Sequence, residues 1–211
     1  MNEEKMRDID INKYDYVLPE ERIAKYPLKK RDESGLLYYN QGNIQDHKFY
    51  ELPDLIPGDV AMYFNNTRVL YARLPFRKPT GGRIEIFCLE PHNPTDYALN
   101  LANKNSCQWK CLVGNLKKWK SGALQLLNNE GLGLEAKLIK KNTEYVVVEF
   151  TWRVDQSFAH VLEVAGDVPI PPYLNRQAEE QDKQTYQTTY SKVDGSVAAP
   201  TAGLHFTEAI F

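Results

Sequence analysis

The sequence has no excess of charge of one sign, because 26 Lys and Arg stand against 28 Asp and Glu in its 211 residues. The overall charge therefore gives no general sign of a polyanion partner, and any nucleic-acid contact has to be local. No apolar run approaches the roughly 18 residues of a membrane helix, and the N-terminus shows no charged-then-apolar leader. We expect a soluble, cytoplasmic protein with no membrane partner.

Cysteine and metal-ligand patterns are also sparse. The three cysteines, Cys88, Cys107 and Cys111, cannot all pair, and no second Cys/His pair follows at the spacing of a tetrahedral zinc site. The sequence contains no Ser-His-Asp arrangement, P-loop or dinucleotide fingerprint. We expect reduced thiols and no metal, and ordinary hydrolase and nucleotide-triphosphatase functions are disfavoured.

The middle of the chain is rich in short strand-like segments. Each is alternating or β-branched and is bounded by Gly, Asn or Pro turns, at residues 83–89, 107–113, 124–127, 134–139 and 145–150. This spacing is typical of a small antiparallel barrel or sandwich. We predict an inserted barrel domain over residues 75–154 and a main domain built from residues 1–74 and 155–211.

The two flanking stretches mix helical and extended patterns. The main candidates are a short helix at 19–24, an extended 36–39 ending in a turn at 41–43, a buried strand at 60–64, a helix at 158–165 ended by Gly166, and a proline strut at 168–174. With the strands of the middle stretch, these patterns predict a mixed α/β fold.

The most informative stretch is a run of small residues near the C-terminus, from Val197 to Gly203, followed by His205 and Thr207. Gly203 can adopt dihedrals closed to other residues, and Thr207 is a candidate N-cap for a helix that begins at once. Such a bend leaves bare main chain for a ligand to approach. The alternative is a tight strand-to-helix turn in which His205 is structural.

Four polar clusters could bind a ligand, and they lie at residues 30–34, 65–73, 80–85 and 171–176. Arg68 and Arg73 could hold a carboxylate or phosphate with their planar guanidinium groups. Taken singly, each cluster is better explained by surface ion pairs or turns. The basic run Lys117–Lys120 contains Trp119 and is either a solvated turn or a nucleic-acid contact.

Together these motifs resemble one family, the S-adenosylmethionine:tRNA ribosyltransferase-isomerases of queuosine biosynthesis. The resemblance runs from about Tyr16 to Phe211, and the motifs occur in the family's order at residues 18–27, 31–34, 66–73, 80–85, 166–176, 186–190 and 197–207. Any one motif is weak, whereas the ordered series is specific.

The resemblance implies an enzyme that transfers and isomerises the ribosyl group of S-adenosylmethionine onto an aminomethyl-deazaguanine at the tRNA wobble position. The implied products are epoxyqueuosine-modified tRNA, adenine and methionine. It also implies an α/β main domain interrupted by a small β-barrel. The partners are then tRNA and S-adenosylmethionine, the latter as substrate, with no metal or redox cofactor. We also expect a monomer.

The motifs supply the candidate site residues. Catalytic roles fall to His205 and Thr207. The substrate-binding candidates are Arg31, Asp32, Ser34, Asn66, Thr67, Arg68, Arg73, Thr80, Gly81, Gly82, Glu85, Tyr173, Arg176, Tyr186, Gln187, Thr188, Ala199, Pro200, Thr201 and Gly203.

The sequence departs from the family's pattern in two respects. Asn66 stands where the family usually has an acid, and Tyr71 where it usually has a proline. The family also continues past the final motif, so we expect the chain to be the front portion of a longer protein and inactive alone.

Our mechanistic hypothesis begins with the sulfonium, which makes the neighbouring C–H groups acidic, so that a base can form an ylide and adenine can leave. We place the methionine carboxylate near Arg68 or Arg73 and adenine or ribose against residues 198–203. His205 then acts as a base or as a donor to adenine. Tyr173 and Tyr190 either stack on a base or fill the core.

Two other function classes stay open. The first is a non-catalytic RNA-binding module whose barrel holds tRNA, although the near-zero net charge weakens it. The second is a small-molecule methyltransferase, which would need a glycine pattern that is missing here.

Overall fold

Six antiparallel strands close into a barrel in the middle of the chain, in the order β4-β5-β6-β9-β8-β7. The structure is a computed structural model that describes residues 10–127 and 131–211. The barrel strands are β4 Arg73–Arg77, β5 Arg83–Asn93, β6 Ser106–Val113, β7 Leu124–Leu126, β8 Glu135–Lys141 and β9 Val146–Thr151. All five predicted segments form strands. The sequence missed β4, because Pro75 inside it reads as a break in a strand.

The barrel interior is filled mainly by alternate side chains of its strands and is closed at one end by helix α3, Phe158–Ala165. The Phe158 ring lies 5.8 Å from the ring of Trp109 and 5.4 Å from that of Phe150. Helix α3 begins where Ser157 Oγ accepts a hydrogen bond from the His160 N–H, and it ends at Gly166 as predicted. Helix α2, Tyr97–Ala102, contacts α3 at the same end.

The three cysteines lie inside the barrel as free thiols. Burial raises the pKa of the Cys107 thiol far above its usual range. A thiol that stays protonated is a poor nucleophile and metal ligand, so Cys107 is a small core side chain.

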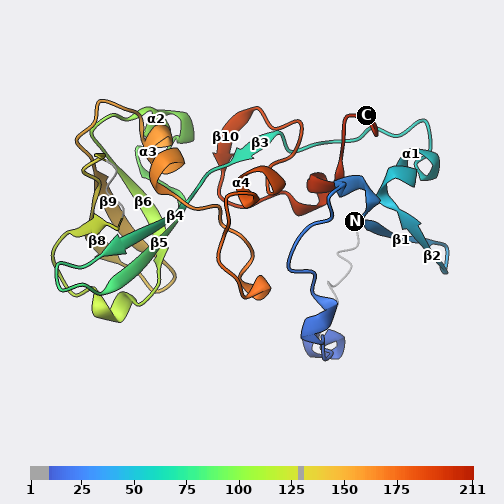
Figure 1. The fold of residues 1–211 in the computed structure, drawn as a ribbon, viewed down its shortest axis with the longest axis horizontal. Coiled ribbons are helices and arrows are strands. Elements are labelled where there is room, and N and C mark those ends of the chain that lie inside the picture. The colour runs from blue at the N-terminus through green and yellow to red at the C-terminus, as the bar shows by residue number, and fades with distance from the viewer. Residues whose placement is uncertain (1–9, 128–130) are drawn as a thin grey trace, which may run out of the picture.

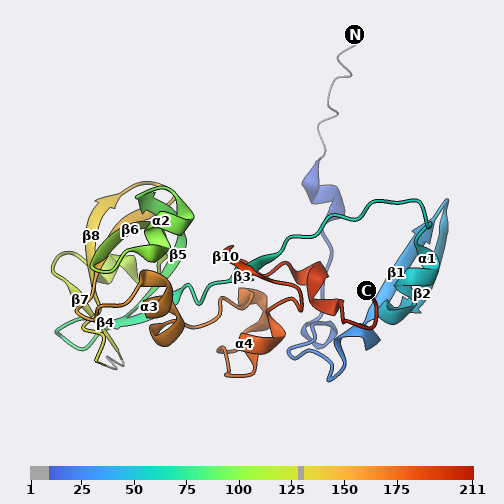
Figure 2. The same cartoon turned by 90° about the horizontal axis from the view of Figure 1, so that it is seen from above.

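The flanking residues form short elements that extend away from the barrel. Figures 1 and 2 show the barrel at one end of an elongated molecule and the β1–β2 hairpin at the other. The strands are β1 Gly35–Asn40 and β2 Asn43–Lys48, which are antiparallel, and β3 Thr67–Val69 and β10 Val193–Ser196, which are parallel. The hairpin turn holds Gln41 and Gly42 at φ of 48° and 93°, as a tight two-residue loop requires.

The remaining elements are short helices. The α-helices are α1 Leu52–Leu55 and α4 Asp182–Thr185. The 3-10 helices are η1 Ile11–Tyr14, η2 Glu20–Arg22, η3 Arg31–Glu33, η4 Phe49–Glu51, η5 Leu116–Lys118, η6 Pro172–Leu174 and η7 Thr201–His205. The fold is therefore mixed α/β with a small antiparallel barrel inserted into the flanking structure, as the sequence predicts. The domain boundaries at 74/75 and 154/155 stay a prediction.

The predicted buried strand at Val60–Phe64 is wrong. This segment has no regular secondary structure, and Tyr63 is 95% exposed. An apolar run becomes a buried strand only when neighbouring strands pair with it, and among the described residues none does. The Phe64 ring packs 5.0 Å from the Phe206 ring.

Among residues 10–127 and 131–211, no helix combines the length and the hydropathy that a membrane-spanning helix needs.

Gly166 connects α3 to the flanking structure at a point of close backbone approach. A Cβ on Gly166 would lie 1.9 Å from the carbonyl oxygen of Tyr71. Directly after it, Asp167 and Arg73 exchange two backbone hydrogen bonds of 2.8 and 3.3 Å. The barrel and the strut after α3 are therefore held together at a position that has no space for a side chain.

We predict that Gly166→Ala lowers the free energy of unfolding by about 1–3 kcal/mol or more, because two backbone segments have to move apart. Gly114→Ala is the matched control, since its Cβ would make an ordinary 3.7 Å contact. Urea unfolding of both variants checks this. Equal midpoints for the two variants would contradict the close approach.

Candidate functional site

A cavity of about 630 Å³ opens where segments distant in the sequence meet. Its walls come from residues 23–35, 171–174, 185–186 and 201–205. Six of the predicted site residues line it, namely Arg31, Ser34, Tyr173, Tyr186, Thr201 and His205. We call it the Arg31–His205 cavity. It is the candidate functional site because five of the family motifs contribute residues to its wall.

Arg31 supplies positive charge to the cavity wall. Its Nη1 donates to the carbonyl of Gln187 at 3.0 Å and its Nη2 to that of Gln184 at 3.5 Å. Within residues 10–127 and 131–211, Arg31 forms no ion pair with a carboxylate. A guanidinium held only by neutral carbonyls retains its charge for an anionic ligand.

His205 is oriented by a backbone contact. Its Nδ1 lies 3.2 Å from the carbonyl oxygen of Arg31, and its ring packs 5.2 Å from the ring of Phe49. A carbonyl only accepts, so Nδ1 carries the hydrogen and donates. The Nε2 atom has no partner among the described residues, and it is the ring nitrogen available for proton transfer.

Asp32 and Thr207 bind each other instead of lining the cavity. The Thr207 hydroxyl donates to Oδ2 of Asp32 at 2.9 Å. This bond ties the η3 segment to the end of η7, next to the His205–Arg31 contact. The geometry gives both residues a bracing role, and the catalytic role of Thr207 stays a prediction.

The small-residue bend is only partly open. A Cβ on Gly203 would lie 2.2 Å from the hydroxyl oxygen of Tyr190 and 3.1 Å from Cγ2 of Thr188, so those side chains cover Gly203. The recess lies beside Thr201, Leu204 and His205 instead. The predicted bare backbone at Gly203 is therefore wrong, whereas a recess beside the bend is present.

The structure also differs from two other predictions for this bend. Ala199 and Pro200 precede η7 and do not line the cavity. No helix begins at Thr207, where the carbonyl instead accepts the N–H groups of Ile210 and Phe211 in a turn.

The two tyrosines considered for stacking behave differently. Tyr173 lines the cavity and is 61% exposed, so it is no core residue. Tyr190 packs edge-on against the ring of Phe64 at 5.3 Å and against that of Phe211 at 5.7 Å, inside a cluster of aromatic rings. Of the two, only Tyr173 can reach a ligand in the cavity.

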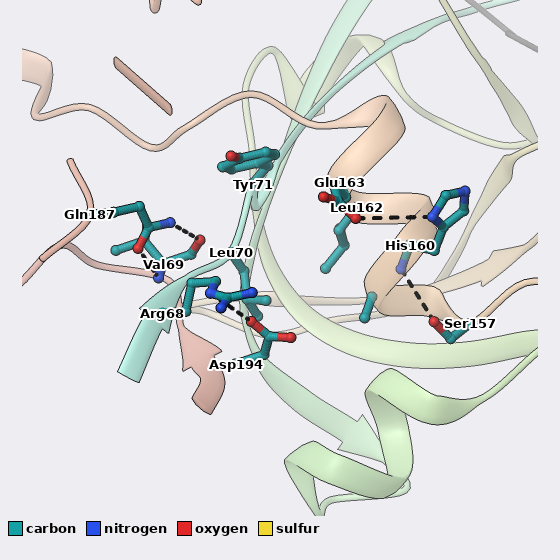
Figure 3. A pocket seen from close by; sticks show the side chains of 11 residues that line it. Arg68, Val69, Leu70, Tyr71, Ser157, His160, Leu162, Glu163, Gln187 and Asp194 are labelled. Atoms are coloured by element: carbon teal, nitrogen blue, oxygen red, sulfur yellow. Dashed lines mark hydrogen bonds and ion pairs between the residues drawn. The ribbon is translucent and has the colours of Figure 1, made fainter. Parts of the chain in front are cut away.

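Arg68 lines a second, smaller cavity of about 230 Å³ between β3 and α3. Figure 3 shows Arg68 beside Asp194, and Glu163 and His160 of α3 across from them. The N–O distance between Arg68 and Asp194 is 3.8 Å. Arg68 and the cavity of His205 are thus separate sites. The hypothesis that Arg68 holds the methionine carboxylate while His205 contacts the same ligand does not fit this geometry.

Gln187 forms hydrogen bonds to residues in the walls of both cavities. Its side-chain amide donates to the Val69 carbonyl at 2.8 Å and accepts from the Val69 N–H at 2.9 Å, as Figure 3 shows. Its backbone carbonyl accepts from Arg31. Gln187 therefore acts like a paired strand residue that fixes β3 relative to the Arg31–His205 cavity.

Other predicted residues in this region have structural partners. The Thr67 hydroxyl donates to the side chain of Asn65 at 2.7 Å, and the Asn66 carbonyl accepts from the N–H of Lys192 at 2.8 Å. Thr188 is buried under Gly203. Neither Asn66 nor Thr67 lines the Arg31–His205 cavity.

A third group of predicted residues lies on the barrel. Arg73 forms an ion pair of 2.9 Å with Glu85 and lies over the Phe87 ring. Thr80, Gly81 and Gly82 form the β4–β5 turn. None of these residues lines either cavity. The role of Arg73 as a partner of the methionine carboxylate stays a prediction.

Arg176 is fully engaged within the protein. Its guanidinium binds both carboxylate oxygens of Asp182, at 2.6 and 2.8 Å, and lies 4.6 Å from the ring centre of Tyr26. Its Nε donates to the Lys25 carbonyl at 2.8 Å. Because Lys25 and Tyr26 form part of the cavity wall, Arg176 positions that wall and has no donor directed at a ligand.

Sequence reasoning missed Asp182, which is fully buried. Burial alone would raise the pKa of Asp182, but hydrogen bonds from Arg176 and from the Glu179 N–H outweigh it and hold the pKa below its usual value. An acidic residue six positions after an arginine gives no signal in the sequence. The reciprocal contact appears only in the folded chain.

We predict that Asp182→Asn lowers the free energy of unfolding by about 3–5 kcal/mol at neutral pH, because it leaves Arg176 without its counter-charge. Since folding lowers the pKa of Asp182, its contribution is present above the carboxyl's unfolded pKa and is lost as pH falls through the folded value. Urea unfolding from pH 7 to pH 3 measures both effects.

The control is Glu180→Gln, which removes a carboxylate that is 84% exposed and paired only with Lys183. Its cost should stay below about 1 kcal/mol. If Asp182→Asn is as mild as this control, the ion pair does not hold the cavity wall.

Comparisons with known proteins place the chain among its relatives. The family model described as "Queuosine biosynthesis protein" matches residues 11–211. An S-adenosylmethionine:tRNA ribosyltransferase-isomerase from Anaeromyxobacter sp. (strain Fw109-5) is 38% identical over 202 residues, which is 95% of this chain and 54% of that protein. One of the same name from Syntrophotalea carbinolica is 38% identical over 204 residues, 95% of this chain and 55% of that protein.

A solved structure is similar as well. The crystal structure of S-adenosylmethionine tRNA ribosyltransferase from Thermotoga maritima aligns with 77% of this chain and 52% of its own, at 25% identity and a TM-score of 0.31. The chain spans about half the length of the curated relatives it matches. Because the family model covers nearly all of the sequence, the chain belongs to the family of queuosine biosynthesis proteins.

Proposed function

We propose that this chain carries the S-adenosylmethionine site of a tRNA ribosyltransferase-isomerase. The reaction transfers and isomerises the ribosyl group of S-adenosylmethionine onto an aminomethyl-deazaguanine at the tRNA wobble position and releases adenine and methionine. The names of the relatives support this activity class. The observation that carries the proposal is the Arg31–His205 cavity, where predicted residues from four motifs meet. Its arginine forms no ion pair with any carboxylate of the described residues.

The size and lining of the cavity suit a nucleoside with a charged tail. Its volume of about 630 Å³ lies within the range of roughly 300–1,000 Å³ that is usual for small-molecule sites. Arg31 offers a planar guanidinium to the methionine carboxylate, and Tyr173 and Tyr186 offer aromatic rings to adenine. In this arrangement Arg31 replaces Arg68 and Arg73 as the carboxylate partner.

His205 supplies the proton chemistry in this proposal. The positive sulfur makes the adjacent C–H acidic, and the unpartnered Nε2 of His205 can accept that proton as the ylide forms. When the bond from ribose to adenine breaks, a protonated Nε2 can return a proton to the departing ring nitrogen. The Arg31 carbonyl holds Nδ1–H throughout and keeps the ring oriented.

We predict that Arg31→Gln weakens S-adenosylmethionine binding to this chain about ten- to hundredfold, because a charge-assisted hydrogen bond contributes roughly 1.5–3 kcal/mol. Arg31→Lys should weaken binding less, since it keeps the charge but not the planar fork. Isothermal titration of S-adenosylmethionine into each variant measures this, with thermal unfolding recorded in parallel.

Arg68→Gln is the matched control, because Arg68 is exposed and lines the other cavity. Its affinity should equal that of the wild type. Loss of binding in Arg68→Gln with none in Arg31→Gln would move the ligand to the second cavity and refute our assignment.

The role of His205 needs a protein of the relatives' full length. We suggest a chimera in which this chain replaces the matching part of the Anaeromyxobacter relative. We expect His205→Ala to slow adenine release about 10²–10⁴-fold, as for other general acid–base residues, with little change in S-adenosylmethionine affinity. Wild-type turnover in His205→Ala would remove this residue from the mechanism.

A further inference from the structure

Three loops meet at one end of the barrel, opposite the end that α2 and α3 cover. In the strand register, Arg77 of β4 lies beside Arg83 of β5, Ile86 of β5 beside Val113 of β6, and Lys141 of β8 beside Val146 of β9. The β4–β5 turn (78–82), the β6–β7 connection (114–123) and the β8–β9 turn (142–145) are therefore neighbours at this end. Helix α2 joins β5 to β6 at the other end (Figure 1).

Six lysines gather on these loops and the adjoining strand ends. They are Lys78, Lys117, Lys118, Lys120, Lys140 and Lys141, and we call this surface the lysine end. Five of them are exposed and Lys78 is half-buried. In the part of the chain that the structure describes, none of the six forms an ion pair, although Glu144 lies in one of the three loops.

The lysine end also reflects a separation of charge along the chain. Residues 75–154 contain 12 Lys and Arg and 7 Asp and Glu, whereas the rest of the chain contains 14 and 21. The net charge of the whole chain is therefore close to zero although the barrel segment is basic and the rest of the chain is acidic. Unpaired lysines that crowd one end repel each other, and a polyanion relieves that repulsion.

Trp119 decides which kind of nucleic-acid contact is available here. Its side chain is fully buried, and its Nε1 donates to the Gly122 carbonyl at 3.0 Å. A buried ring cannot stack on a base, so Trp119 does not recognise the base sequence of a nucleic acid. Instead it anchors the loop in the core and fixes where the flanking lysines emerge. Lysine ammonium groups without aromatic partners contact phosphates.

The Thr80–Gly82 turn belongs to the same surface. Gly81 has a φ of +92°, which closes the turn tightly, and the Lys78 side chain runs against Gly82, where a Cβ would meet it at 3.5 Å. The family motif at these positions lines neither cavity. Its place at the lysine end gives it a role in presenting Lys78.

We propose that the lysine end binds the sugar–phosphate backbone of the tRNA, away from the base that reacts. The choice of tRNA as the polyanion rests on the proposed function. The contact is independent of sequence, and it holds the RNA to the barrel while the Arg31–His205 cavity handles S-adenosylmethionine. Each lysine that neutralises a phosphate releases counterions, so binding here weakens steeply with salt.

The test compares the wild-type chain with a variant that carries Lys117→Gln, Lys118→Gln and Lys120→Gln. Affinity for a transcribed tRNA is measured by filter binding between about 50 and 200 mM salt. We expect at least about tenfold weaker binding at the lowest salt and a salt slope that is smaller by about two to three, roughly one unit for each phosphate contact. Trp119 is untouched, so the thermal unfolding midpoint should not change.

The control variant carries Lys13→Gln, Lys48→Gln and Lys192→Gln, three exposed lysines outside the barrel. It removes the same charge and should keep the wild-type slope. An equal loss in both variants, an unchanged slope in the lysine-end variant, or no measurable tRNA binding by the wild type would overturn the proposal.

Failure of this inference can be distinguished from failure of the proposed function. S-adenosylmethionine affinity of the lysine-end variant should equal that of the wild type, because no lysine of this surface lines the cavity. If the chimera releases no adenine while lysine-dependent tRNA binding persists, the proposed reaction fails and this inference stands. If adenine release is normal and tRNA affinity is insensitive to these lysines, the proposed reaction stands and this inference fails.

Discussion

The structure outside the barrel depends on the hydrogen bonds that converge on Arg31. Its carbonyl accepts from His205 and its guanidinium donates to the backbone of Gln187. The side chain of Gln187 in turn pairs with both backbone groups of Val69. Four segments with little regular secondary structure are thereby fixed relative to one another. Residues 156 to 174 positions apart in the chain meet at this point, which is why the cavity exists at all.

The barrel and the cavity differ in the physical basis of their structure. The barrel has a continuous apolar core, and its surface loops carry the charges of the lysine end. The cavity is built from turns and 3-10 helices whose polar groups are partly satisfied by one another, which leaves Arg31 and Nε2 of His205 to serve a ligand. In our proposal, a small charged nucleoside and a large polyanion bind different surfaces of one chain.

The sequence predicts the barrel because alternation of apolar residues within each strand is a local signal. It fails at Val60–Phe64, where burial depends on strands elsewhere in space. The motifs predict which segments form the cavity, but not which side chain faces it. Arg176 looks like a ligand-binding arginine until its buried partner Asp182 is seen, and Arg31 looks like part of a surface ion pair until its neighbours prove to be carbonyls.

The central claim is that S-adenosylmethionine occupies the Arg31–His205 cavity of this chain. Amide hydrogen exchange with and without saturating S-adenosylmethionine tests it most directly, because ligand contact slows local opening. The account predicts added protection at residues 23–35 and 201–205 and little change at 68–71 and 157–163. Protection confined to the latter segments, or none in either, would contradict it.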